Sequence, residues 1–192
     1  EELPEVERLI HNLYKIGVDA IIVQDPAVLK LNLPPIALHA STQMHNYNLE
    51  RIKFLDRLGF QRIVLARELS LEQLREIRRE VKAELEYFVH GALCVSLSGQ
   101  CYMSHYLMNR SANRGECAQA CRMRWRVEDD AGKVVLKDKY VLSLKDLNLS
   151  AHLSELVEAG IDSFKIEGRL KEADYVANVT SYYSGRLDEI GA

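Results

Sequence analysis

One unit recurs along the sequence: a helical stretch, then a glycine, then a short run of β-branched and apolar residues. It occurs at residues 15–23 (KIGVDAIIV), 57–65 (RLGFQRIVL) and 158–166 (EAGIDSFKI). Each glycine stands where the end of a helix needs a left-handed residue, and each following run is apolar enough to be buried on both faces of a sheet. The unit therefore predicts a helix, a tight turn and a parallel strand, the building block of α/β folds.

Hydrophobic periodicity extends this pattern over most of the chain. We expect helices at residues 3–16, 47–58, 70–82, 149–159 and 172–188, strands at residues 19–24, 36–41, 62–67, 85–90 and 162–167, and a β-hairpin at residues 124–142.

The number of expected strands favours an incomplete barrel. A complete (β/α) barrel has eight strands and about 250 residues, whereas this chain has 192 residues and opens on an expected helix. We predict an α/β fold with a single domain over residues 1–192, an incomplete TIM-like (β/α) barrel that lacks its first strands. Residues 91–126 form a cysteine- and arginine-rich insertion in this fold. The open sheet edges of such a barrel predict a homo-oligomer.

The composition is that of a folded protein without a membrane segment, with 47% hydrophobic and 28% charged residues. No apolar run approaches the roughly 20 residues that cross a bilayer, and the first residues, EELPEVERL, are acidic where a signal peptide is basic. We expect a cytoplasmic protein. The net charge of −3 gives no general argument for nucleic acid, so any such site must be local.

Polar side chains follow the expected strands at the points where these strands end. In parallel α/β folds the carboxyl ends of the strands are where ligands bind. Strand ends also meet water, which explains any single polar residue, but the set as a whole favours a substrate site. Its members are His39, Gln43, Arg67, Glu68, His90, Lys165 and Glu167.

All four cysteines, Cys94, Cys101, Cys117 and Cys121, lie in one short segment. In a reducing compartment such clustering indicates a metal site before it indicates disulfides. Four thiolates can hold tetrahedral zinc or a cubane iron-sulfur cluster. Zinc sites of four cysteines usually have two to four residues between paired ligands, and only Cys117 and Cys121 meet that spacing. Inert buried thiols are the remaining alternative.

Arginines concentrate beside the cysteines, with five of them against one acid between residues 105 and 126. In CRMRWR, Arg122, Arg124 and Arg126 alternate with apolar residues, so a strand would present three guanidinium groups on one face. That face could bind RNA phosphates or the carboxylates of a small diacid. The alternative is a solvated face paired with neighbouring acids.

The stretch EYFVHGALCVSLSGQCYMS resembles the signature of peptidase family U32, the collagenase-like peptidases. The resemblance depends on Glu86, Phe88, Gly91, Ala92, Leu93, Cys94, Gly99, Cys101 and Ser104, and it extends to residues 66–77, 113–129, 143–147 and 165–171. It implies either the peptidase activity for which the family was named or RNA hydroxylation. The hydroxylation targets would be a wobble uridine of tRNA or a cytidine of large-subunit rRNA, with dependence on prephenate and on a four-iron four-sulfur (4Fe-4S) cluster.

The residues themselves favour hydroxylation over proteolysis. A peptidase needs a nucleophile with a base, or a metal motif such as HExxH. The six histidines show no HExxH spacing, and the spacing of Cys94 and His90 does not fix a hydrogen bond between them. Of the two activities that the resemblance implies, we therefore expect RNA hydroxylation. As the resemblance further implies, it would depend on an iron-sulfur cluster with the cysteines as ligands, with RNA as partner and prephenate as a candidate co-substrate. A collagenase-like peptidase and a non-catalytic binding or assembly module, stabilised by a cluster or zinc, remain as alternatives.

Overall fold

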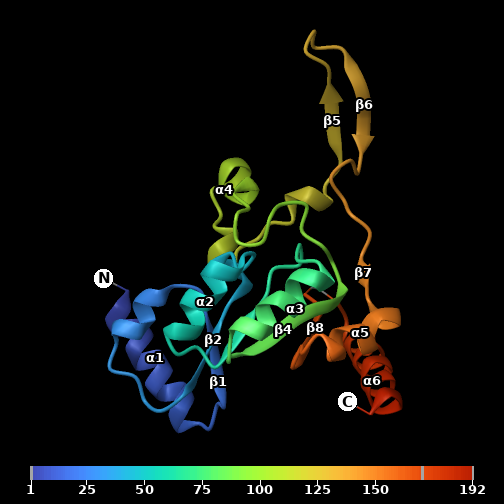
Figure 1. Ribbon diagram of the computed structural model, residues 1–192. Helices are drawn as coiled ribbons and strands as arrows, with labels where there is room; N and C mark the ends of the chain where they lie inside the picture. The colour runs from blue at the N-terminus through green and yellow to red at the C-terminus, as the bar shows by residue number, and fades with distance from the viewer. Residues whose placement is uncertain (1, 170, 192) are drawn as a thin grey trace.

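The computed structural model describes residues 2–169 and 171–191. Parallel strands form its main sheet in the order β1, β2, β3, β4 and β8, and together they make a half-barrel (Figure 1). The bounds are Ala20–Val23 for β1, Ala37–Ala40 for β2, Arg62–Val64 for β3, Glu84–Gly91 for β4 and Ser163–Glu167 for β8. A short strand, β7 (Leu147–Asn148), pairs antiparallel with the end of β4. The predicted α/β class and incomplete barrel are confirmed.

Helices alternate with these strands as the repeated unit predicts. They are α1 (Leu3–Lys15), α2 (Leu49–Arg57), α3 (Leu71–Glu80), α5 (Leu153–Glu158) and α6 (Ala173–Ile190). The glycines of the three repeated units directly follow the C-cap residues of α1, α2 and α5, and all have positive φ, at 84°, 88° and 81°. An L-residue there would be strained, which explains why glycine ends each helix.

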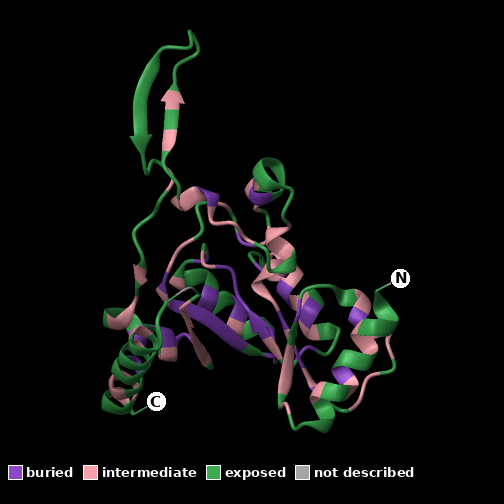
Figure 2. Ribbon diagram, turned by 180° about the vertical axis from the view of Figure 1, so that it is seen from behind, coloured by how far each residue is buried: buried purple, intermediate pink, exposed green. Residues whose placement is uncertain are grey.

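The sheet buries its outer face against the helices and leaves a polar inner face. Outward-pointing residues such as Leu38, Ile63 and Leu85 join the hydrophobic core with residues of α2, α3 and α5. Figure 2 shows this buried band along the centre of the sheet. The expectation that each strand is buried on both faces is met by the run that contains β3, where Ile63, Val64 and Leu65 are all buried, and it is wrong for β1 and β8. Side chains alternate between the two faces of a strand, and on the inner face Ile22 of β1 is 53% exposed.

The predicted hairpin is a separate two-stranded antiparallel sheet. Its strands, β5 (Trp125–Glu128) and β6 (Val134–Lys139), extend away from the half-barrel (Figure 1), and every residue of β6 is exposed. Between β4 and β5 the chain forms a short helix that was not predicted, α4 (Met103–Met108). The described residues also form 3-10 turns: η1 (Pro26–Lys30), η2 (Thr42–Met44), η3 (Ala112–Arg114), η4 (Ala120–Arg122) and η5 (Ser150–His152).

Within the described ranges, none of the helices combines the length and apolarity that a membrane crossing requires.

Candidate functional site

A cavity of about 270 Å³ lies at the carboxyl ends of the parallel strands. The loop after β2, the end of β3, and strands β4 and β8 form one side of it, and the cysteine-rich segment forms the other. The expected strand-end site and the cysteine cluster are therefore one place. Of the residues predicted from the sequence, the cavity is lined by Cys94, Cys101, Cys117, Cys121, Gln43, Arg67, Arg122, Lys165 and Glu167.

The four thiols facing this cavity are free, with no disulfide among them. Burial raises the pKa of Cys94, Arg67 lowers it, and the other three cysteines raise it again. Burial also raises the pKa of Cys121, with Cys117 and Cys101 adding to the effect and Arg122 opposing it. Each of these two thiols therefore lies in the electrostatic field of the other cysteines and of an arginine.

As a donor set, four free thiols around one cavity fit a zinc ion or a 4Fe-4S cluster. Cys94, Cys101 and Cys117 come from loop segments and Cys121 from the short turn η4, where backbone adjustment is easier than in a strand. In the part of the chain that the structure describes, no three His, Cys, Asp or Glu side chains have the arrangement of an assembled metal site.

Two cations flank the ring of Phe88 in the cavity wall. The Arg67 guanidinium lies 3.6 Å from the ring centroid and the Lys165 ammonium lies 5.6 Å from it. Arg67 also forms an ion pair with Glu167 at 3.7 Å, and its side chain is only 13% exposed. An aromatic face and a carboxylate thus hold a buried positive charge beside Cys94.

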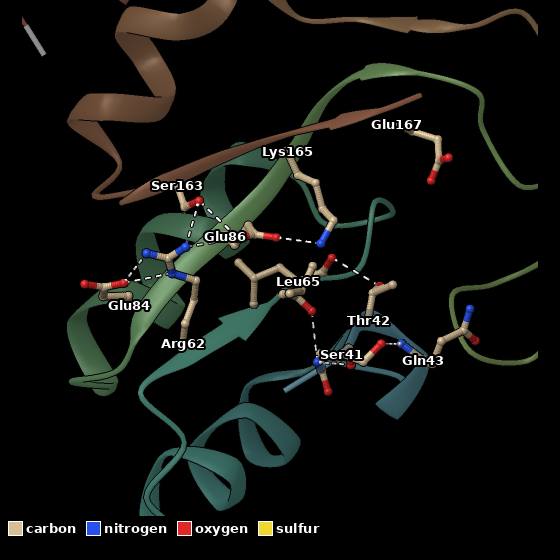
Figure 3. Close-up of polar contacts among 12 residues, drawn as sticks. Ser41, Thr42, Gln43, Arg62, Leu65, Glu84, Glu86, Ser163, Lys165 and Glu167 are labelled. Atoms are coloured by element: carbon tan, nitrogen blue, oxygen red, sulfur yellow. Dashed lines mark hydrogen bonds and ion pairs between the residues drawn. The ribbon is translucent and has the colours of Figure 1, made fainter. Parts of the chain in front are cut away.

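Glu86 is a site residue that the strand-end prediction missed, because it lies in the middle of β4 and below the cavity. Its carboxylate accepts hydrogen bonds from Lys165 Nζ at 2.8 Å and Ser163 Oγ at 3.0 Å, and pairs with Arg62 at 3.4 Å (Figure 3). Burial opposes the ionisation of Glu86, but these partners outweigh it and lower its pKa. Glu86 therefore stays charged and fixes the position of Lys165. The available signal was a carboxylate next to the apolar run Tyr87–Val89 of the expected strand.

Three of the predicted strand-end residues do not line the cavity as the described residues form it. Glu68 accepts hydrogen bonds from the backbone N–H and hydroxyl of Ser98, and so anchors the loop between Cys94 and Cys101. His39 lies in a second hollow on the inner face of the sheet with Arg62 and Glu86. Burial lowers the pKa of His39, and the nearby Arg62 lowers it further.

His90 is the third of these residues, and it faces α6. Its Nδ1 lies 3.3 Å from the hydroxyl of Tyr183. The pairing of β4 with β8 has an irregularity between Phe88 and His90. Such a bulge interrupts the alternation of side chains, which explains why His90 does not share the side of Phe88.

The loop with Cys94 and Cys101 packs closely on the loop after β2. Gly99 has φ of 77°, and a Cβ at this position would lie 2.6 Å from the carbonyl oxygen of Gln43. Only glycine permits both that backbone conformation and that approach. The Nδ1 of His45 also donates to the carbonyl of Ser98 at 2.6 Å, so a hydrogen bond joins the same two loops.

The arginines of CRMRWR do not share one face. Arg122 lies in η4, where it lines the cavity and donates to the carbonyl of Leu93 at 3.0 Å and to Ser143 Oγ at 2.9 Å. Arg124 precedes β5 and pairs with Asp138 at 2.8 Å, and Arg126 pairs with Glu128 on the hairpin. The predicted face of three guanidinium groups is wrong because the chain leaves η4 only at Met123, before the strand begins.

Several known proteins are similar in sequence to nearly the whole of this chain. The chain is 53% identical over 190 residues to the 23S rRNA 5-hydroxycytidine C2501 synthase of Escherichia coli, covering 99% of this chain and 29% of that protein. It is 37% identical to the tRNA hydroxylation protein P1 of Bacillus subtilis and 35% identical to a collagenase of Porphyromonas gingivalis, with 98% of this chain covered in each case. It spans 47% and 48% of the lengths of these two proteins.

A solved structure titled as that of the U32 peptidase Mk0906 matches with a TM-score of 0.47 and 18% sequence identity, covering 73% of this chain and 58% of the other. The model of peptidase family U32 matches residues 1–192. The chain therefore belongs to peptidase family U32.

Proposed function

We propose that this chain carries the reactive cavity of an RNA hydroxylation enzyme. The observation that carries this proposal is the common location of all four cysteines with the cations Arg67 and Lys165, at the end of the sheet where α/β folds bind ligands. The relatives named for rRNA and tRNA hydroxylation support RNA as the substrate class. With 53% identity to a 23S rRNA synthase, a cytidine of large-subunit rRNA is the first substrate to test, and a tRNA wobble uridine the second.

Cys94, Cys101, Cys117 and Cys121 would hold the proposed 4Fe-4S cluster. When bound, such a cluster supplies one-electron redox chemistry at the cavity. The same four thiolates could hold zinc, which has no redox chemistry and would give the site a structural role.

The chain's own residues would bind and orient the reactants. Arg67 and Lys165 present two positive charges to the cavity, which suits the two carboxylates of prephenate as a co-substrate. Glu86 holds Lys165 in place through its 2.8 Å hydrogen bond. Glu68 and His45 hold the loop between Cys94 and Cys101 against the sheet.

Peptidase activity is the alternative that the name collagenase of one of these relatives and the name of the family raise. The one Cys-His pair that the sequence suggests is Cys94 with His90. Among the described contacts His90 pairs with Tyr183 on α6, so it is not oriented as a base for Cys94. This geometry favours hydroxylation over cysteine-dependent proteolysis.

Two measurements test the proposal. After anaerobic purification we expect brown protein with iron and acid-labile sulfide, and a Cys94→Ser variant with less of both. Expression in cells that lack their own hydroxylation enzyme should restore the hydroxylated nucleoside, detected by mass spectrometry of digested rRNA and tRNA. Ser96→Ala, which changes another residue lining the cavity, is the control and should keep its iron. Colourless, zinc-containing protein without hydroxylated nucleosides would overturn the proposal in favour of a structural metal module.

A further inference from the structure

The short helix α4 exposes two aromatic rings beside the cavity. Tyr106 is 88% exposed and Tyr102 is 61% exposed. The backbone N–H of Tyr106 donates to the carbonyl of Tyr102 at 3.0 Å, so the two residues lie one helical turn apart, on the same side of the helix. Leu107 and Met108 of the same helix are about two-fifths exposed. Several exposed aromatic and apolar residues on one short helical segment indicate a binding surface more than an isolated apolar residue does.

This helix is tied to the segment that lines the cavity. Ser104, only 2% exposed, accepts a hydrogen bond from the backbone N–H of Ala118 through its Oγ at 3.0 Å. The Asn113 side chain donates to the carbonyl of Gly99 at 3.4 Å, and both Asn113 and Gly99 line the cavity. Tyr102 directly follows Cys101, another lining residue. Helix α4 is therefore held next to the segment that lines the cavity, and Figure 1 shows it above the sheet.

The charge around α4 fits a polyanion. No Asp or Glu occurs between Glu86 and Glu116, whereas Arg110 and Arg114 lie in this interval. Arg114 forms an exposed pair with Glu2, and no ion pair is found for Arg110 among the described residues. Against the net charge of −3 for the chain, this is a local positive surface. Exposed aromatic rings beside arginines are the combination with which proteins bind unpaired nucleotides, through base stacking and phosphate contacts.

We propose that Tyr102 and Tyr106 form a stacking platform for unpaired nucleotides of an RNA, with Arg110 at the phosphates. The inference rests on the proposed function and adds the surface that would hold the RNA. Because the platform adjoins Cys101, a nucleotide next to the stacked bases reaches the mouth of the cavity. A base must leave its helical stack before an enzyme can modify it within a pocket, and a platform at the rim favours the unstacked form.

The test is RNA binding by matched variants of the whole chain. The probe is a fluorescently labelled single-stranded RNA of about 12 nucleotides, within the range that such surfaces cover, and its Kd is measured by anisotropy at several salt concentrations. Tyr106→Ala should weaken binding roughly 5- to 150-fold, the range found for loss of one stacked base. Tyr106→Phe should restore it, whereas Tyr106→Leu should not, because stacking needs a ring. Tyr182→Ala, a 52% exposed tyrosine on α6, is the control and should bind like the parent.

The outcomes separate this inference from the proposed function. Unchanged Kd in the Tyr102→Ala/Tyr106→Ala double variant overturns the platform and leaves hydroxylation standing. Tyrosine-dependent RNA binding without any hydroxylated nucleoside supports the platform and counts against hydroxylation. A parent chain that binds no RNA overturns both. Binding to vesicles of phosphatidylcholine and phosphatidylserine that depends on these tyrosines, with RNA binding unaffected, would assign the patch to a membrane surface and overturn the RNA platform. Both rings are exposed, so unchanged Tm values will verify folding.

Discussion

The carboxylate of Glu68 accepts two hydrogen bonds from Ser98, one from its backbone N–H at 2.5 Å and one from its hydroxyl at 2.9 Å. Ser98 is 4% exposed and lies between Cys94 and Cys101. Its carbonyl accepts a further hydrogen bond from His45. The loop that carries two of the four thiols is therefore held to the sheet by its middle, although neither thiol takes part in the contact.

Removal of the Glu68 carboxylate should loosen this loop. We expect Glu68→Ala to lower the free energy of unfolding by about 1–3 kcal/mol, since it leaves buried donors of Ser98 without a partner. Cys94 and Cys101 should also react faster with iodoacetamide, as measured by mass spectrometry of the labelled peptides. Glu76→Ala, at an exposed position of α3, is the matched control. Equal labelling rates in Glu68→Ala and in the parent would show that the loop does not depend on Glu68.

Glu86 makes stability depend on pH in a defined direction. Its pKa in the folded chain lies below the ordinary value of 4.5, so the unfolded chain binds the proton more readily. The stabilisation is complete above about pH 4.5 and is lost as the pH falls through the lowered pKa. Urea unfolding between pH 7 and pH 3 should show this loss in the parent and less of it in Glu86→Gln.

At neutral pH, Glu86→Gln should also be destabilising. The substitution leaves Lys165 without its carboxylate, which we expect to cost about 1–3 kcal/mol, as for other hydrogen bonds to charged groups. Glu84→Gln is the control because the Glu84 side chain is 53% exposed and pairs with the same Arg62. Its effect should stay under about 1 kcal/mol. Equal losses of stability in Glu86→Gln and Glu84→Gln would contradict the larger contribution that we expect from the buried Glu86 carboxylate.

Substitutions of Arg122 and Arg124 should have different effects, the first on stability and the second on RNA binding. Arg122→Gln removes hydrogen bonds to Leu93 and Ser143, so we expect a lower Tm and faster proteolysis of residues 123–146. Arg124→Gln should leave Tm unchanged, because its side chain pairs with Asp138 in solvent. It should weaken RNA binding at low salt, and less so at high salt, because phosphate contacts release counterions. If Arg124→Gln and the parent bind RNA with the same affinity, Arg124 is a solvated surface residue that does not contact RNA.

The open edge of β1 leads to the prediction of a homo-oligomer. Strand β1 is at the end of the sheet, and Ile22 on its inner face is 53% exposed. Light scattering should detect a dimer or larger assembly, and Ile22→Lys should shift it toward the monomer by charging the edge. Ile16→Lys, at an exposed position after α1, is the control. A parent chain that is monomeric at all concentrations would rule this assembly out.

The sequence predicts those features that depend on local patterns. The helices, the parallel strands and the left-handed glycines follow from hydrophobic period and turn chemistry, which act over a few residues. The position of His90 could not be predicted because it depends on the irregular pairing of β4 with β8, between strands far apart in the chain. The partners of Glu86 come from β3 and β8, and the anchor of Glu68 is thirty residues away. Helix α4 has six residues, too few for a recognisable period.

The prediction of a site from polar strand ends is correct for four residues, and the reason is the geometry of parallel strands. Parallel strands bring their carboxyl ends to one edge, so Gln43, Arg67, Lys165 and Glu167 do line one cavity. The same rule does not predict whether a given side chain points toward the cavity or toward a loop. Arg67 lines the cavity, whereas its neighbour Glu68 binds Ser98 in the loop.

All four cysteines lie outside the hydrophobic core, which is built from the strands and helices of the half-barrel. In small zinc domains the metal supplies much of the folding free energy, and the chain unfolds without it. Here the apolar interior is complete without the thiols. Binding of the proposed metal would therefore be separable from folding: the polypeptide could fold first and take up the metal afterwards, without passing through an unfolded state.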